Sequence, residues 1–145
     1  MKKSSRLSLA LHALVHLEAQ PDKHLTSTAL ASCLLTNPVV VRRILGELRE
    51  ARLVAASKGP SGGWMLARPA EDITVREVYA AMGESLLVRT QSEPGDHGCA
   101  IVRSVDAVMK DVLADAEALL AERLAQLRIS DLARQTHGAR IPQLG

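Results

Sequence analysis

Two adjacent arginines follow a pair of valines in this sequence, and these residue types at this spacing suit the recognition of DNA bases. The guanidinium groups of Arg42 and Arg43 can donate hydrogen bonds to guanine O6 and N7 or to phosphate oxygens. The methyl groups of Val39 and Val40 suit the C5-methyl group of thymine. The segment therefore predicts contacts in the major groove of double-stranded DNA.

Other spacings suggest weaker chemistry. His12 and His16 lie four residues apart, as metal ligands on a helix face do, but no HExxH pattern accompanies them. We interpret both as structural. The glycine-rich run 59–63 lacks the lysine and the Ser/Thr of a P-loop, so a nucleotide site is not predicted. No paired acids and no Ser/His/Asp or Cys/His spacing suggest catalysis, and we predict that the protein is not an enzyme.

The chain has two cysteines, which are too few for a disulfide scaffold and form no CxxC pair. Cys33 is predicted on the inner face of a helix, where a cysteine usually acts as a small apolar residue. Cys99 is predicted at the start of a long helix, whose dipole favours the thiolate. A structural role for both cysteines and a redox-sensing role for Cys99 therefore remain alternatives.

The arginine pair belongs to a predicted helix-turn-helix. Thr26, Ser27 or Thr28 can cap its first helix, whose inner face is predicted to hold Ala29, Leu30, Cys33 and Leu34. Residues 35–37 form the turn, Asn37 is a suitable N-cap, and Pro38 suits the first helical position. The second helix has a core-facing stripe formed by Val41, Ile44, Leu45 and Leu48. The valines and arginines then lie on the outer face of its first two turns, the part of a recognition helix that reaches base edges.

A glycine-tipped hairpin follows this second helix. Residues 53–58 and 64–67 are strand-like, and the glycine-rich run lies between them. This order predicts a winged helix-turn-helix, whose wing approaches phosphates or the minor groove. We assign further DNA contacts to the start of the first helix of the helix-turn-helix and to the wing: Thr26, Ser27, Thr28, Lys58, Gly62 and Gly63.

The C-terminal half predicts a dimer. A helical stripe runs unbroken over residues 99–128, and thirty residues of helix span about 45 Å, more than the diameter of a domain this small. The stripe is therefore expected to pack on a second copy, although folding back on its own domain is the alternative. Its members are Val105, Val108, Met109, Val112, Ala116, Leu119, Leu120, Leu124 and Leu127.

These patterns predict a mostly α fold with a small β-wing (α+β). Residues 1–83 are expected to form the winged helix-turn-helix domain, in which Thr74 caps a short helix over 75–82. Residues 84–98 form a flexible loop, 99–128 the dimerisation helix, and 129–145 a short helical turn with a disordered tail. Any small-molecule pocket is expected between the winged helix-turn-helix domain and the long helix, near residues 83–99.

Charge is unevenly distributed along the chain. Residues 1–68 contain ten Lys and Arg against four Asp and Glu, whereas residues 69–145 contain eight against twelve. The basic half is expected to face a polyanion. With no Phe, one Trp and one Tyr, the chain lacks the aromatic platforms typical of single-strand binders. No signal peptide or bilayer-length apolar run is evident, so we expect a cytoplasmic protein with no membrane partner.

The sequence around the hairpin resembles a known family. The run 47–54 (ELREARLV), the wing 58–69 (KGPSGGWMLARP) and the segments Asp72–Val75 and Glu77–Val78 look like the Rrf-two family of bacterial winged-helix transcription regulators. The similarity covers nearly the whole chain and ends near the Ile129–Leu132 element. It implies a homodimer on a palindromic promoter site, and we expect this regulator to act as a repressor. By position, the base and phosphate contacts fall on Asn37, Val39, Val40, Arg42 and Arg43, and Lys58 takes the basic wing position.

The chain departs from the family members that hold an iron–sulfur cluster. In those members, three cysteines precede the long helix, whereas residues 84–99 contain only Cys99, and His97 does not replace the missing ligands. We therefore expect no cluster and place the chain in the cluster-free branch, whose small-molecule or oxidant effectors are undefined. A winged-helix module that binds proteins rather than DNA is the functional alternative.

Overall fold

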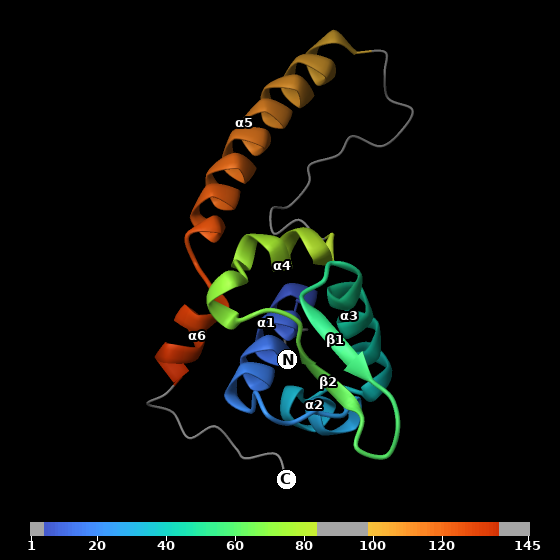
Figure 1. Ribbon diagram of the computed structural model, residues 1–145. Helices are drawn as coiled ribbons and strands as arrows, with labels where there is room; N and C mark the ends of the chain where they lie inside the picture. The colour runs from blue at the N-terminus through green and yellow to red at the C-terminus, as the bar shows by residue number, and fades with distance from the viewer. Residues whose placement is uncertain (1–4, 84–98, 137–145) are drawn as a thin grey trace.

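The computed structural model describes residues 5–83 and 99–136, and over these residues it is mostly helical with one small antiparallel sheet (Figure 1). This confirms the predicted fold class. In chain order the elements are α1 (Arg6–Ala19), α2 (Ser27–Leu34), α3 (Pro38–Glu50), β1 (Val54–Ser57), β2 (Gly63–Leu66), the 3₁₀ helix η1 (Ala70–Asp72), α4 (Val75–Met82), α5 (Ala100–Ala125) and α6 (Ile129–Thr136).

Local capping chemistry defines where the first helices begin. The Ser5 hydroxyl accepts a hydrogen bond from the Ser8 N–H at 3.0 Å, and Thr26 Oγ1 accepts one from the Ala29 N–H at 3.1 Å. Each cap satisfies a backbone donor that the helix itself leaves unpaired. Thr74 goes further and forms a complete capping box with Glu77 at the start of α4.

The core of the winged domain is aliphatic, and no polar or charged residue among those described is buried. Helix α1 supplies much of it, and α3 adds the predicted stripe of Val41, Ile44, Leu45 and Leu48, each at most 2% exposed. Arg6 fastens α1 to its neighbours, since it pairs with Glu47 of α3 and donates a 3.1 Å hydrogen bond to the Met82 carbonyl oxygen of α4.

Helix α2 departs from the predicted inner face, of which Leu30 alone is buried while Ala29 and Leu34 are half-buried. Leu30 and Ala31 are buried, whereas Cys33 is only half-buried. The helix has only eight residues and contacts α3 and α1, and Leu30 and Ala31 are the residues that it buries. Cys33 then flanks the core instead of filling it.

The hairpin is tied to the segment that precedes α2. Strands β1 and β2 pair in antiparallel register from Val54–Leu66 to Ser57–Gly63, and Leu25 and Trp64 exchange two backbone hydrogen bonds of 3.0 and 2.8 Å. A Cβ atom at Gly63 would lie 2.7 Å from the Leu25 carbonyl oxygen, so only glycine permits this close approach. The predicted turn therefore ends one residue earlier, and Gly63 opens β2.

Helix α5 extends away from the winged domain (Figure 1) and has no buried residue. Its 26 residues span about 39 Å, and it ends before the predicted position 128. The reason is a backbone exchange with the η1–α4 segment: the Val75 N–H donates to the Leu127 carbonyl at 2.8 Å, and the Ile129 N–H donates to the Ile73 carbonyl at 2.9 Å. These bonds turn the chain out of the helix.

The predicted short turn after residue 129 is in fact the eight-residue helix α6, which packs against α1 and η1. Ile129 is fully buried and Ala133 is 3% exposed, so α6 belongs to the core of the winged domain. The predicted loop 84–98 and tail 137–145 lie outside the described residues. Within the described part of the chain, no single helix is long and apolar enough to span a bilayer; only α2 and α3 taken together pass such a criterion, and they meet at 109°.

Candidate nucleic-acid interface

Helices α2 and α3 form a helix-turn-helix. Their axes differ by 109°, which lies within the usual range for this motif. The turn is tight because Leu35 adopts the left-handed conformation and its N–H donates to the Ala31 carbonyl. Asn37 then caps α3: its Oδ1 accepts the Val40 N–H at 3.0 Å, and Pro38 follows directly. The start of α3 is thereby fixed relative to α2.

The predicted recognition residues at the start of α3 are not equivalent in the structure. Val39 is 58% exposed, and Arg42 and Arg43 are exposed. Among the described residues, no hydrogen bond or ion pair engages either guanidinium group. Val40 instead is half-buried and packs against the core, because it lies one turn before Ile44 and flanks the buried stripe. Its methyl groups are therefore less available than those of Val39.

The start of α2 lies close to the hairpin. Thr26 and Thr28 are exposed, whereas Ser27 is half-buried and its Oγ accepts a 3.0 Å hydrogen bond from Trp64 Nε1. The Ser27 hydroxyl keeps its own proton for a further acceptor. Ser27 therefore joins the hairpin to α2, a contact that the sequence reading does not predict because it depends on tertiary placement.

Trp64 is also covered by a cation. The Arg49 guanidinium carbon lies 5.9 Å from the centre of the Trp64 ring, within the range of a cation–π contact. Trp64 thus holds the hairpin against α2 through its N–H and against α3 through its ring face. The wing and the helix-turn-helix are one connected surface as a result.

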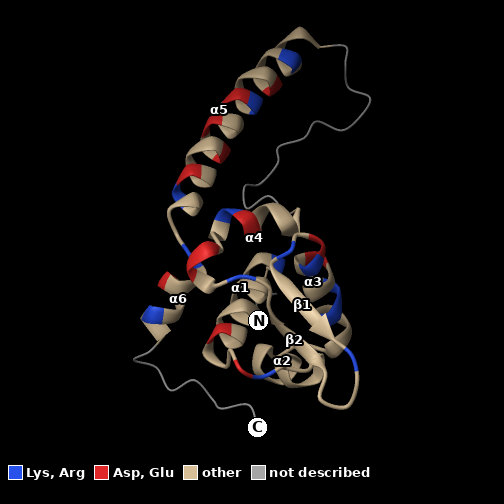
Figure 2. Ribbon diagram, viewed as in Figure 1, with Lys and Arg blue, Asp and Glu red and all other residues tan. Residues whose placement is uncertain are grey.

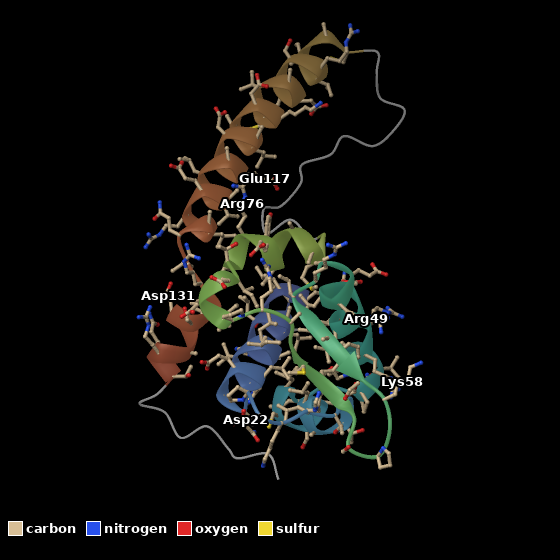
Figure 3. All side chains as sticks on the ribbon, viewed as in Figure 1. Asp22, Arg49, Lys58, Arg76, Glu117 and Asp131 are labelled. Carbon is tan, nitrogen blue, oxygen red and sulfur yellow. The ribbon has the colours of Figure 1, made fainter. Side chains whose placement is uncertain are left out.

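The wing residues have distinct local roles. Lys58 is exposed at the end of β1, and Figure 3 shows Lys58 and Arg49 both extending outward from the side of α3 and the hairpin. The Gly62 N–H donates to the Gly59 carbonyl at 2.9 Å, and a Cβ atom at Gly62 would lie 2.5 Å from the Ser57 carbonyl oxygen. Gly62 and Gly63 are therefore required by the hairpin backbone, whatever they contact outside it.

Basic side chains gather at the helix-turn-helix and the hairpin. Figure 2 shows lysine and arginine along α3 and at the start of the hairpin loop, while acidic and basic positions alternate along α5. A surface with this distribution attracts a phosphate backbone to one side of the molecule.

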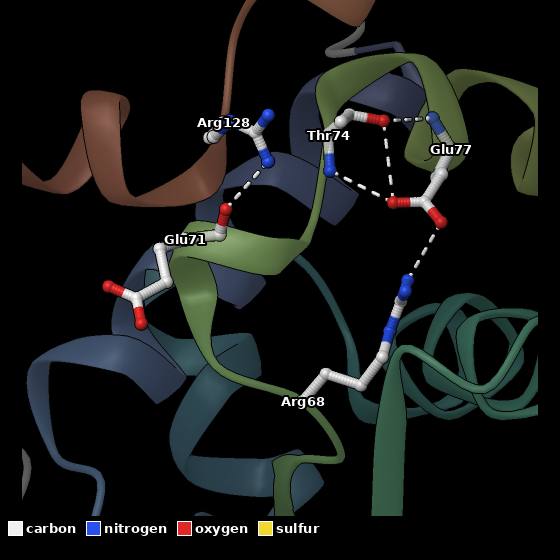
Figure 4. A network of polar contacts seen from close by, with 5 residues as sticks. All are labelled: Arg68, Glu71, Thr74, Glu77 and Arg128. Atoms are coloured by element: carbon white, nitrogen blue, oxygen red, sulfur yellow. Dashed lines mark hydrogen bonds and ion pairs between the residues drawn. The ribbon is translucent and has the colours of Figure 1, made fainter.

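A polar network connects the chain leaving the wing to the segment between α5 and α6 (Figure 4). Arg68 donates to Glu77 at 2.9 Å, and Glu77 also accepts the Thr74 N–H at 3.0 Å. Arg128 donates to the Glu71 carbonyl at 2.8 Å. Burial raises the pKa of Glu77, but the Thr74 N–H and Arg68 outweigh it, so the pKa lies below its ordinary value of 4.5.

Cys99 is the exposed N-cap residue of α5. The backbone N–H groups of Val102 and Ile101 lower the pKa of its thiol, although neither makes a full capping hydrogen bond to Sγ. Exposure and a favoured thiolate are the conditions for reaction with oxidants or electrophiles.

The described residues contain no cluster of three or more His, Cys, Asp or Glu side chains that could hold a metal. His16, one of the spaced histidines, is half-buried, and burial followed by the charge of His12 lowers its pKa. Across the whole sequence, the two cysteines lie in α2 and at the start of α5. This donor set does not fit a cluster held by three closely spaced thiolates.

One surface hollow of about 390 Å³ lies between the end of α1 and the chain leaving β2. The predicted pocket near residues 83–99 is in a different place and falls mostly outside the described residues. The hollow is lined by Leu17, Glu18, Pro21 and the run 66–70.

Known proteins resemble this chain over most of its length. Residues 3–135 match the Rrf2 (Rrf-two) family, described as an iron-dependent transcriptional regulator. YwnA of Bacillus subtilis, which carries the name of an HTH-type transcriptional regulator, is 26% identical over 129 residues, covering 89% of this chain and 95% of that protein. IscR of Cereibacter sphaeroides, also an HTH-type transcriptional regulator, is 35% identical over 89 residues, covering 59% of this chain and 57% of that protein.

Solved structures share the fold. The IscR structure from T. potens superposes with a TM-score of 0.71 at 21% identity, covering 99% of this chain and 93% of that one. A transcriptional regulator from Lactobacillus plantarum superposes with a TM-score of 0.76 at 21% identity, covering 93% and 91%. With the helix-turn-helix geometry and the family match over residues 3–135, the chain belongs to the Rrf2 family and is a DNA-binding transcriptional regulator.

Proposed function

We propose that the protein binds a palindromic promoter site as a homodimer and represses transcription there, with the start of α3 reading bases and the hairpin contacting the flanking backbone. The observation that supports this most directly is the pair of exposed arginines, Arg42 and Arg43, which have no partner among the described residues. Arginine side chains that are fixed at a helix start and free of intramolecular pairs suit guanine edges and phosphates.

The remaining predicted contacts have graded roles in this proposal. Val39 meets the apolar edge of a base pair, and Val40 supports it from its half-buried position. The amide N–H groups of Asn37 and the hydroxyl groups of Thr26, Ser27 and Thr28 contact phosphates. Lys58 and the backbone at Gly62 and Gly63 bring the wing to the neighbouring phosphates or minor groove.

Helix α5 is the proposed dimer contact. Six of its large apolar residues are at least 36% exposed. An exposed apolar surface of this extent is typical of a protein–protein contact. In the domain division that follows, residues 1–83 form the DNA-binding unit and 99–128 the dimerisation segment, and α6 returns from the segment 129–145 to complete the core of the DNA-binding unit. Binding to promoter DNA places the protein in the cytoplasm.

We propose no iron–sulfur cluster and no catalytic activity for this chain. Support for the first comes from the donor set, since the chain has two cysteines on separate elements. Spectra of protein purified without oxygen test it. The absence of cluster absorbance and of iron in stoichiometric amounts is expected, and one cluster per chain would contradict the proposal.

A thiol-sensing role for Cys99 is the second candidate, favoured by its exposure and its lowered pKa. In this proposal an oxidant or electrophile modifies the thiolate and changes DNA affinity. Cys99→Ser should abolish the change, and Cys33→Ser should retain it. If a thiol reagent modifies Cys99 no faster than a free thiol and leaves affinity unchanged, this role is excluded.

Selection of bound sequences from a random duplex pool, in reducing buffer, tests the main proposal. An enriched inverted repeat with half-sites one helical turn or a multiple apart is expected. Binding should weaken steeply with salt, by several powers of ten if roughly 6–10 phosphates are contacted. Failure to enrich any sequence, or binding that is insensitive to salt, would instead favour a protein-interaction module.

A further inference from the structure

The turn between α2 and α3 holds a leucine in a backbone conformation that leucine disfavours. Leu35 has φ 54° and ψ 44°, and it is 82% exposed. In this left-handed region the Cβ atom approaches a carbonyl oxygen, so glycine and asparagine are the usual occupants. In the folded protein, Leu35 therefore has a strained backbone conformation and a side chain that is not buried.

The turn fixes Leu35 in this position from both sides. The N–H groups of Leu35 and Thr36 both donate to the Ala31 carbonyl, the second at 3.0 Å, and Asn37 caps α3 two residues further on. Moving the leucine into the core would break these bonds. Its side chain is consequently held in solvent beside the start of the recognition helix.

Outside α5, the exposed apolar residues lie on the surface proposed to face DNA. Within the described residues, eight large hydrophobic side chains are strongly exposed, and six of them lie on α5. The other two are Leu35 and Val39, four positions apart across the helix-turn-helix turn. Outside the long helix, the exposed apolar surface is therefore concentrated where α3 begins.

We propose that Leu35 is a base-specificity residue whose side chain contacts the C5-methyl group of a thymine in the major groove, next to the contact made by Val39. The thymine methyl group is the apolar feature of the major-groove edge, and contact with it excludes water from both surfaces. This inference rests on the proposed role of α3 as the recognition helix, and it adds a residue from the turn to that role.

Binding of the duplex enriched from a random pool tests the inference, with each thymine replaced in turn by deoxyuridine, which lacks only the methyl group. Wild-type protein should lose about three- to fivefold in affinity at the thymine contacted by Leu35 in each half-site, which is the loss expected for one buried methyl group, and a thymine contacted by Val39 should give a separate loss. Replacing the base pair that Leu35 contacts by 5-methylcytosine·guanine should retain more affinity than replacing it by cytosine·guanine.

Two variants connect this loss to Leu35. Leu35→Asn should lower affinity for the enriched duplex about tenfold and abolish the deoxyuridine effect at one thymine in each half-site, while an effect at the thymine contacted by Val39 remains. Binding to an unrelated duplex should stay the same because no charge changes. The melting temperature of this variant should not fall, since asparagine tolerates the left-handed conformation. Leu35→Met keeps an apolar side chain and should retain both the affinity and the deoxyuridine effect.

The results separate this inference from the proposed function. A wild-type protein that binds the enriched duplex but responds to no deoxyuridine, or a Leu35→Asn variant that keeps the wild-type response, overturns the role of Leu35 alone. A wild-type protein that binds no duplex overturns both. An effect of Leu35→Asn on self-association without an effect on base preference would assign the leucine to a protein contact and overturn the inference.

Discussion

At the scale of single residues, the proposed DNA-facing surface is distinguished by arginines that have no partner within the described chain. Arg42 and Arg43 have no intramolecular partner among the described residues, whereas Arg49 lies over Trp64 and Arg68 pairs with Glu77. The paired arginines hold the hairpin and α4 in place. The unpaired ones remain available to an external anion, which is the physical basis for assigning them to DNA.

Replacing Arg42 distinguishes a base contact from a phosphate contact. Arg42→Ala should cost about 1–3 kcal/mol of binding free energy and relax specificity at one position if the guanidinium reads a base. Arg42→Lys keeps the charge but loses the planar fork, so it should restore phosphate binding and not base reading. Fluorescence anisotropy on matched and single-substituted duplexes measures both effects.

Arg76→Ala is the matched control, since Arg76 is exposed on α4 and carries the same charge. It should change affinity far less than Arg42→Ala. Equal losses from the two substitutions on every duplex would show that Arg42 contributes only to the overall charge.

The depressed pKa of Glu77 predicts that part of the free energy of unfolding is lost in acid. Its pKa is depressed in the folded protein, so its contribution to the free energy of unfolding is complete above its ordinary pKa of 4.5 and is lost as pH falls through the folded pKa. Glu77→Gln should therefore destabilise the protein most near neutral pH, and the difference from wild type should shrink below about pH 4.5. Urea unfolding between pH 7 and pH 3 measures it. A constant difference across this range would contradict the assigned cause.

At the scale of elements, local chemistry accounts for most boundaries that the sequence predicts correctly. Asn37 and Thr74 each cap a helix as expected, and Thr26 is the one of three candidate residues that caps α2, because an N-cap depends only on residues within one turn. The four-residue stripe of α3 is likewise buried, since periodicity alone determines that face. The predictions that depend on residues distant in sequence were less accurate.

Three differences between expectation and structure share this tertiary origin. The end of α5 is determined by backbone bonds to Ile73 and Val75, more than fifty residues earlier in the chain. Val40 is half-buried because it flanks the buried stripe of α3 and packs against the core of the domain. The Trp64–Ser27 bond joins residues 37 positions apart. The periodicity of apolar residues cannot predict contacts between residues that are far apart in the sequence.

Helix α6 offers a direct test of the discontinuous core. Ile129 is fully buried, and Ile129→Ala should lower the free energy of unfolding by about 2–4 kcal/mol through lost burial and a residual cavity. Gln135→Ala, an exposed substitution on the same helix, should change it by less than about 0.5 kcal/mol. Similar values for the two variants would mean that α6 does not contribute to the core.

At the scale of the whole molecule, the long helix and the winged domain are joined by short polar and backbone links. Arg128, Glu71, Thr74, Glu77 and Arg68 connect the end of α5 to the chain that leaves the hairpin (Figure 4). In the proposed dimer, a change in how α5 packs on a second copy would act on the wing through this segment. Dimer geometry and wing position are expected to be coupled for this reason.

The dimer prediction is tested by charging the exposed stripe of α5. Val105→Asp with Val112→Asp should convert the protein to a folded monomer, because two carboxylates are costly to bury in an apolar contact. Sedimentation velocity should show the lower mass, circular dichroism an intact fold, and binding a loss of at least a hundredfold on an inverted repeat. Asp111→Asn, exposed on the same helix, is the control. A dimer that survives both aspartates would place the interface elsewhere.

The most direct test of the central claim, that the start of α3 reads DNA bases, compares the sequences selected by wild type and by Arg42→Ala/Arg43→Ala from the same random duplex pool. The account predicts an inverted repeat for the wild type, and for the variant the same spacing with lost preference at one or two symmetric positions in each half-site. An identical preference at every position would contradict it, because the bases would then be read by another part of the protein.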